Sequence, residues 1–407
     1  TPEIEVRKCD VLNPNELRLS LHDASEDTPI LCLQDRVVFS YISVLESMAW
    51  IGNWKYWIPS KGILHARLKP LARKIWGSFP DHAHPLDKTN WRVLHNKGES
   101  SRLKDAEGTL KIEEDSYYYM KPIAGMGSEG VIKVQGKFLE KEAEQLRKRT
   151  QGPNSSDDVL CVNVSNLIFN LGSDILIEEV LVGPEFTVDG FIDDKGASMV
   201  IQHKESQIFS TFIGDGLVCS PPAFHDKVIG AVASRFKDQI VQESTESLIK
   251  SFVTAGLRAL EINNWVFHAE IKLTSDGPRF VELNPRPAGG LLSLTAGYHL
   301  GLDLFELCIR SHLRINSLHR TQGITGHIPI YAQQLGKYMG LTNLEVVKML
   351  DGVMLQEQET IGTEISDLSQ ENYLAFIVIH GNTHECVRTK ANLVMALVKP
   401  IFESKDI

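Results

Sequence analysis

The sequence lacks long apolar runs, an excess of positive charge and closely spaced cysteines, and each absence excludes a class of protein. No apolar stretch approaches the roughly 20 residues that a membrane-spanning helix needs. The formal net charge of −10 argues against a nucleic-acid partner, which would favour a basic face. The six cysteines are scattered, without the paired spacing of a zinc site or a disulfide framework. We therefore expect a cytoplasmic protein with reduced thiols and with neither a membrane nor a nucleic acid as partner.

Signal peptides, internal repeats and low-complexity segments are also missing, so we expect ordinary globular domains. The 407 residues, of which 43% are hydrophobic, are enough for two to four domains or subdomains with cores of their own. The chain opens on Thr1 rather than on Met, and the expectation is that a first strand–helix unit is missing from it.

A segment in the second half of the chain carries acidic side chains on a predicted hairpin. Apolar and polar residues alternate up to turn residues Thr274–Gly277, so a strand with one buried face should fold back on a second strand. A turn centred on Asp276 places Glu270 opposite Glu282, and a bulge would shift this register by one. Opposed carboxylates about 4.5–5.5 Å apart at Cβ repel each other unless a cation lies between them. With Asn284, the hairpin predicts a magnesium–nucleotide site, and the alternative is a solvated strand face.

A glycine-rich loop upstream is a second, independent signal for phosphate binding. The strand Tyr117–Pro122 ends with Lys121, and Val131–Val134 is typical of another strand. Neither a P-loop nor a dinucleotide fingerprint fits, because no Gly-Lys-Ser/Thr follows and the glycines lead into a strand. Strand, glycine loop and strand predict a flap whose backbone N–H groups approach a triphosphate, and an ordinary glycine hairpin is the alternative. The predicted flap residues are Gly125, Gly127, Ser128 and Gly130.

A third segment, Asp174–Phe186, is a short apolar strand interrupted by two glutamates and followed by a turn. The backbone of Glu179–Leu181 could contact adenine, and Glu185 could hold ribose hydroxyls; a solvated edge strand would have the same pattern. Lys204 follows on another predicted strand, where it either reaches the phosphates or is solvated. The residues predicted to contact nucleotide here are Glu178, Glu179, Leu181, Glu185 and Lys204.

Together these motifs resemble the ATP-grasp superfamily over roughly residues 87–314. The segment Ile177–Phe186 is similar to the adenine and ribose segment of D-alanine–D-alanine ligases. The acidic hairpin and Arg286, at intervals of 12, 2 and 2, resemble the set of biotin carboxylase-like members. The sequence NPRPAGG at 284–290 resembles L-amino-acid ligases and carnosine synthase-type enzymes.

The resemblance implies a role for each matching residue. Asp87-Lys88 should open a helix and supply the first ATP lysine, and Lys121 should be the second. Arg286 and Lys121 would be catalytic, with Arg286 contacting the transferring phosphate. ATP and Mg²⁺ (or Mn²⁺) are the implied cofactors, and the implied metal ligands are Glu270, Glu282 and Asn284.

The resemblance also implies an α/β fold with α+β lobes. We expect a preATP α/β domain over 1–86, a small ATP-grasp lobe over 87–183, a large lobe over 184–314 and a C-terminal subdomain over 315–407. Within the preATP domain, Trp50–Phe79 shows neither a helical nor a strand periodicity and is interpreted as a linker or lid. The basic clusters, including Lys69–Lys74, are interpreted as solvated helix faces.

The implied reaction is ATP-dependent ligation of a carboxylate to an amine through an acyl phosphate, and both substrates should be small molecules. We also expect the chain to form a homodimer. Phosphoryl transfer makes the carboxylate a good acyl donor, and a closed flap would exclude water from the intermediate. Three alternatives stay open, namely a small-molecule kinase, a carboxylase of biotin carboxylase type and a non-catalytic nucleotide-binding module.

Overall fold

The computed structural model divides into two compact units, each built from several segments of the chain. Unit 1 consists of Thr1–Val182, Phe252–Trp265 and Pro278–Arg286, and unit 2 of Gly183–Ser251, Val266–Gly277 and Pro287–Ile407. The residues that the structure describes are 14–20, 60–78, 80–81, 84–85, 87, 89–94, 108–123, 130–150, 161–164, 167–170, 173–193, 196–204, 217–219, 245–263, 265–289, 292–293, 296, 304–310, 324–332, 334–366 and 373–403. The boundaries of the four predicted segments stay a prediction.

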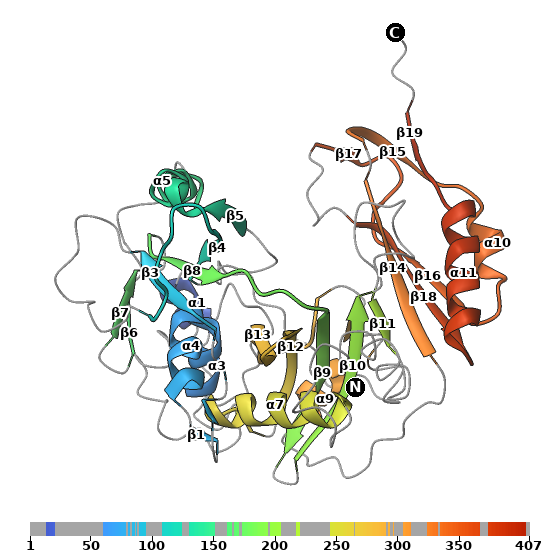
Figure 1. Ribbon diagram of the computed structural model, residues 1–407. Coiled ribbons are helices and arrows are strands. Elements are labelled where there is room, and N and C mark those ends of the chain that lie inside the picture. Colours follow the sequence, from blue (N-terminus) through green and yellow to red (C-terminus); the bar gives the residue numbers. More distant parts are fainter. Residues whose placement is uncertain are drawn as a thin grey trace. The chain divides into compact units, whose positions relative to one another are not determined.

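Unit 1 contains a four-stranded antiparallel sheet in the order β3-β8-β4-β5. Its strands are β3 (Trp91–Leu94), β8 (Ile175–Glu179), β4 (Tyr117–Pro122) and β5 (Ile132–Gln135). Helix α5 (Leu139–Thr150) covers one face, where Tyr118, Met120 and Ile177 join Ala143 and Leu146 in one apolar cluster (Figure 1). Because side chains alternate along a strand, Lys121 and Glu178 lie on the opposite face from this cluster.

The glutamates of β8 do not lie on an edge strand, because β8 is hydrogen-bonded to β3 on one side and to β4 on the other. Both β4 and β5 form where the flap motif predicts strands. The remaining short elements of this part are α1 (Pro14–Ser20), β1 (Pro80–Asp81), β2 (His84–Pro85), β6 (Cys161–Val164), β7 (Leu167–Asn170) and a 3-10 turn at Gly136–Phe138.

The interpretation of Trp50–Phe79 as a linker or lid is wrong for its described part. Residues 60–78 form two helices, α3 (Ser60–Arg67) and α4 (Lys69–Ser78). Trp76 anchors α4, because its ring stacks on Phe280 at 4.2 Å between centroids and its Nε1 donates to the carbonyl of Gly256. An aromatic side chain that is 2% exposed and hydrogen-bonded belongs to a core.

The largest sheet has the strand order β13-β12-β9-β10-β11-β14-β18-β16, and its strands β9, β10, β11, β14, β16 and β18 lie in unit 2. The predicted hairpin forms β12 (Trp265–Thr274) and β13 (Gly277–Asn284). Gly277 has φ +103 at the turn, and Thr274 Oγ1 donates to its carbonyl and accepts from Asp276 N. The other strands are β9 (Glu185–Asp193), β10 (Gly196–Lys204), β11 (Leu217–Cys219), β14 (Ile324–Tyr331), β16 (Val353–Glu357) and β18 (Tyr373–Gly381).

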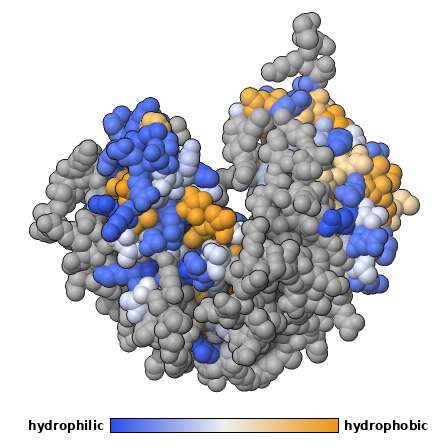
Figure 2. Space-filling view, in the orientation of Figure 1, coloured by the Kyte–Doolittle hydropathy of each residue, from blue (hydrophilic) through white to orange (hydrophobic). Residues whose placement is uncertain are grey.

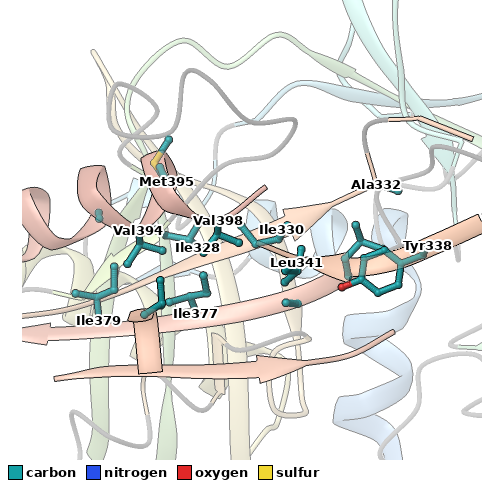
Figure 3. Close-up of a cluster of buried hydrophobic side chains, with 14 of the residues drawn as sticks. Ile328, Ile330, Ala332, Tyr338, Leu341, Ile377, Ile379, Val394, Met395 and Val398 are labelled. Atoms are coloured by element: carbon teal, nitrogen blue, oxygen red, sulfur yellow. The ribbon is translucent and has the colours of Figure 1, made fainter. Parts of the chain in front are cut away.

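The C-terminal part of unit 2 has its own apolar core between the sheet and α11 (His384–Leu397). Alternate residues of β14 and β18, including Ile328 and Ile377, meet Val394 and Val398 there (Figure 3). Thr383 caps α11 by accepting a hydrogen bond from Cys386 N, which fixes the start of the helix at His384. Further elements are α7 (Thr245–Ala259), α9 (Leu304–Arg310), α10 (Leu344–Lys348) and the three-stranded sheet of β15 (Gly336–Leu341), β17 (Glu364–Ile365) and β19 (Pro400–Phe402).

Apolar side chains also lie on the surface of this C-terminal part (Figure 2). The exposed ones include Leu335, Val346, Met349 and Ile361. Among the described residues, no helix is long and apolar enough to cross a membrane.

Candidate nucleotide and metal site

Lys121, predicted as an ATP lysine, lies at the end of β4 and is only 6% exposed. Its ammonium contacts Glu178 Oε2 at 2.5 Å and donates to the carbonyl of Val281 at 3.4 Å. The contact with Val281 places Lys121 next to β13, which carries two of the predicted metal ligands. Lys121 is therefore held at the end of β4 by a carboxylate and a backbone carbonyl, and its role as an ATP lysine stays a prediction.

Glu178 is the centre of a buried ion network rather than a solvated strand residue. Its Oε1 accepts from Arg73 Nε at 2.5 Å, and the same guanidinium reaches Asp87 Oδ2 through Nη1 at 2.6 Å. Burial alone would raise the pKa of Glu178, but the charges of Arg73 and Lys121 outweigh it and lower the pKa from 4.5 to about 2. Glu178 is thus ionised, and both its oxygens are engaged by protein cations.

The expectation that Asp87-Lys88 opens a helix is wrong. The described residues around it, 87 and 89–90, are not helical, and β3 begins at Trp91. Asp87 is 4% exposed and accepts from both the backbone N–H and the hydroxyl of Thr89. These bonds and the pair with Arg73 make Asp87 a buried structural carboxylate, while Lys88 lies outside the described residues.

Glu282, a predicted metal ligand on β13, forms an ion pair with Lys69 across 3.1 Å. Burial would raise the pKa of Glu282, but Lys69, Lys121 and Arg67 outweigh it and lower the pKa to about 2. The interpretation of Lys69–Lys74 as a solvated helix face is therefore wrong. The side chain of Lys69 is 11% exposed, and the helix buries Pro70, Leu71, Ala72 and Arg73.

Asn284 and Arg286 follow Glu282 at the end of β13. Asn284 is 3% exposed, and its backbone carbonyl accepts a hydrogen bond from the backbone N–H of Arg286 at 2.9 Å. Trp265 Nε1 donates to the carbonyl of Pro285 between them, at 2.8 Å. The backbone that presents Asn284 and Arg286 is therefore fixed on both sides.

Glu270, the other predicted metal carboxylate, lies on β12 in unit 2. Its Oε1 is 3.4 Å from His268 Nε2, and the second ring nitrogen of His268 is 3.0 Å from Asp189 Oδ1. Burial would lower the pKa of His268, but Asp189 and Glu270 outweigh it and raise the pKa to about 10. A protonated imidazole therefore faces Glu270. The pairing of Glu270 with Glu282 stays a prediction.

The other predicted contacts are placed as follows. Glu179 accepts from the backbone N–H of Asn90 at 2.8 Å, and Leu181 is half-buried in the connection that follows β8. Glu185 opens β9 and pairs with Lys272 across 3.5 Å. Lys204 ends β10, as predicted for a strand residue, where its backbone pairs with Leu217. Gly130 has φ +72, which suits glycine, and the remaining flap residues, Gly125, Gly127 and Ser128, lie outside the described residues.

Taken one by one, the predicted metal ligands carry donor atoms of the types that a hard divalent cation binds. Glu282 is held ionised, Glu270 faces a positively charged imidazole, and Asn284 adds an amide oxygen, the ligand types that Mg²⁺ prefers. No group of three or more His, Cys, Asp or Glu side chains that could hold a metal occurs among the described residues. Glu270, Glu282 and Asn284 stay predicted metal ligands.

Several residues of these networks are absent from the predicted set, among them Lys69, Arg73 and Asp189. Lys69 and Arg73 fall in a stretch without a clear period, and their partners lie far along the chain. Asp189 alternates with Thr187 along β9, so the period of two could have placed both on one face. His268 is absent as well, since its partner Asp189 is 79 residues away in sequence.

Comparison with known proteins supports the fold that the sequence predicts. Residues 118–295 match the family model described as ATP-grasp domain. Phosphoribosylamine–glycine ligase of Methanococcus vannielii is 24% identical over 202 residues, which cover 44% of this chain and 41% of that protein. The chain thus aligns with less than half of the length of this curated relative.

Several solved structures resemble the chain over most of its length. The L-amino acid ligase from Bacillus licheniformis has a TM-score of 0.67 at 17% identity, covering 96% of this chain and 85% of its own. Phosphoribosylglycinamide synthetase from Anaerococcus prevotii has a TM-score of 0.61 at 14% identity, covering 98% and 88%. The biotin carboxylase domain of Hydrogenobacter thermophilus 2-oxoglutarate carboxylase, a dimer in complex with MgADP, has a TM-score of 0.59 at 15% identity, covering 98% and 80%. The expected ATP-grasp fold is confirmed.

Proposed function

We propose that this chain, whose residues 118–295 are an ATP-grasp domain, is an ATP-dependent carboxylate–amine ligase. It would form an amide or peptide bond between small molecules, with amino acids or small peptides as the substrate class, and release ADP and phosphate. Two structural neighbours with this chemistry in their names, an L-amino acid ligase and a phosphoribosylglycinamide synthetase, support the class of reaction.

The observation that carries the proposal is the gathering of cations around an ionised carboxylate in unit 1. The charges of Lys69, Lys121 and Arg67 all act on Glu282 and keep it ionised. Carboxylates and ammonium groups side by side suit a phosphate chain with its metal, because the cations neutralise phosphate and the carboxylate holds the metal. A non-catalytic module would not need this combination.

Each residue has a proposed task. Glu270, Glu282 and Asn284 would hold Mg²⁺ or Mn²⁺, which when bound neutralises phosphate charge. Lys121 would leave Glu178 for a phosphate oxygen, and Arg286 would contact the transferring phosphoryl group. Lys88, the flap residues and Lys204 would complete the phosphate contacts. Glu179, Leu181 and Glu185 would contact adenine and ribose, whereas Glu178 is better explained as the anchor of Arg73 and Lys121.

The test is product analysis with a trapping amine. The protein is incubated with ATP, Mg²⁺, hydroxylamine and a panel of amino acids and small peptides, and hydroxamate, ADP and phosphate are measured. The ligase predicts hydroxamate in step with ADP for at least one carboxylate. ADP with a stable phosphate ester would favour the kinase instead, and AMP with pyrophosphate would contradict the acyl-phosphate route.

A matched pair of variants ties the activity to the site. Glu282→Gln removes the proposed metal charge and should abolish hydroxamate formation, whereas Glu114→Gln makes the same change at an exposed position of unit 1 and should have no effect. Homodimerisation and a cytoplasmic location stay predictions, the first of which size-exclusion chromatography with light scattering would check.

A further inference from the structure

His268 is a buried histidine that lies between two carboxylates of unit 2. It is 4% exposed on β12, and Asp189 on the neighbouring strand β9 is 0% exposed. The imidazole Nδ1 is 3.0 Å from Asp189 Oδ1, and Nε2 is 3.4 Å from Glu270 Oε1. Both nitrogens of the ring are therefore directed at carboxylate oxygens, which act as acceptors.

Exposure of the three side chains increases in order from Asp189 through His268 to Glu270. Asp189 is fully enclosed, the side chain of His268 is 5% exposed, and that of Glu270 is 32% exposed. Residues 268 and 270 are two apart on one strand, so both side chains lie on the same face of the sheet. The buried pair is thus attached to one oxygen of a partly exposed carboxylate.

A carboxylate tethered through Oε1 cannot rotate freely, and its second oxygen is left to accept another partner. Partners behind a metal ligand commonly fix the ligand in this way and set its affinity for the metal. We propose that Asp189 and His268 are positioning residues, which hold Glu270 so that its second oxygen is presented to the divalent cation of the nucleotide. This inference rests on the proposed function, because it takes Glu270 to be a metal ligand.

Two substitutions of His268 separate positioning from simple packing. In His268→Asn, the side-chain amide nitrogen falls near the place of Nδ1, so the contact with Asp189 is kept and the one with Glu270 is lost. In His268→Gln, the amide nitrogen falls near the place of Nε2, so the contact with Glu270 is kept and the one with Asp189 is lost. Both changes remove the ring and leave a neutral amide of similar chemistry.

The readout is binding of Mn²⁺ to the full chain in the presence of ADP, measured by the loss of the free Mn²⁺ signal in electron paramagnetic resonance. We expect His268→Asn to weaken Mn²⁺ binding about 10- to 100-fold, the usual cost of losing a partner behind a metal ligand. His268→Gln should weaken it at most about 3-fold, below that range. ADP binding without metal should be the same in both variants and in the unchanged protein.

Thermal unfolding without metal or nucleotide reports on packing. If the pair only supports the fold, His268→Gln should be the more damaging change, because it breaks the contact with the fully enclosed Asp189. Should His268→Asn fail to fold, Asp189→Asn provides the contrast. It keeps an acceptor for His268 but removes the charge, and it should weaken Mn²⁺ binding in the same direction and to a smaller extent.

Equal Mn²⁺ affinity in the two His268 variants would overturn the proposal, as would unchanged affinity in His268→Asn or in Asp189→Asn. A failure of the proposed function would look different. In that case the unchanged protein would bind Mn²⁺ and ADP with the predicted order among the variants, yet form no hydroxamate with any carboxylate.

Discussion

Arg73 should be the most costly single charge to remove from unit 1. Its side chain is 3% exposed, and the guanidinium binds Glu178 through Nε, Asp87 through Nη1 and the carbonyl of Val281 through Nη2 at 3.3 Å. In Arg73→Met the stem volume is largely kept, but two buried carboxylates lose their shared cation. Glu178 retains Lys121, whereas the contacts that Asp87 keeps with other described residues are the hydrogen bonds from Thr89.

Breaking a buried ion pair from one side costs about 3–5 kcal/mol, because an uncompensated charge stays in the interior. We therefore expect the free energy of unfolding to fall by about this amount. Urea denaturation at neutral pH measures it, and the midpoint should drop by at least about 1 M if the slope is no more than about 3 kcal/mol/M. Lys74→Met, one residue further on the same helix at an exposed position, is the control and should change stability by less than about 0.5 kcal/mol.

The double variant Arg73→Met with Glu178→Gln should lose less stability than the sum of the single changes, because each single change breaks the same contact between Arg73 and Glu178. A loss below about 1 kcal/mol in Arg73→Met would refute the reasoning, because it would place the residue among exposed ion pairs. Simple additivity in the double variant would likewise contradict the network.

Three further changes test other parts of the structure. In Gly256→Ala the added Cβ would lie 2.3 Å from the ring of Phe280, so overpacking of about 1–3 kcal/mol should exceed the ~1 kcal/mol gain in helix propensity. Urea unfolding measures the loss of stability, and Ser251→Ala, a substitution at an exposed position of the same helix, is the control. The pKa of Glu178 in the folded protein lies below its ordinary value, so the stability that Glu178 contributes is complete above pH 4.5 and is lost as the pH falls towards 2. In Glu178→Gln, the free energy of unfolding should therefore fall less steeply with decreasing pH over this range. Lys121→Met should reduce ADP formation at least ~10-fold, because one charge-assisted contact is worth about 1.5–3 kcal/mol; unchanged ADP formation would count against Lys121 as a phosphate ligand.

The sequence predicts those elements whose signal is local. Alternating polarity and the glycine of a tight turn locate β12 and β13 and place His268 and Glu270 on one face. The strands on either side of the flap, β4 and β5, follow from short apolar runs bounded by glycines. These features depend on neighbours two to four residues apart, which the sequence displays directly.

The rest depends on partners that are distant in sequence. The side chain of Arg73 looks like part of a basic helix face, and only Glu178, 105 residues away, turns it into a buried anchor. Lys69 is likewise drawn into an ion pair by Glu282, which is distant in sequence. A pattern of charges along a helix does not specify which of these side chains will form ion pairs with residues on a strand, because burial is set by tertiary packing. For this reason the solvated face predicted at Lys69–Lys74 is wrong.

The transfer of oxygen from the carboxylate substrate to phosphate tests the central claim most directly. A carboxylate identified by hydroxamate trapping is labelled with ¹⁸O and consumed with ATP and its amine, and the phosphate released is examined by ³¹P nuclear magnetic resonance. An acyl phosphate keeps one carboxylate oxygen on phosphorus when the amine displaces it, so each phosphate should carry one ¹⁸O atom and the nucleotide product should be ADP. Unlabelled phosphate, or label recovered in AMP, would contradict the account.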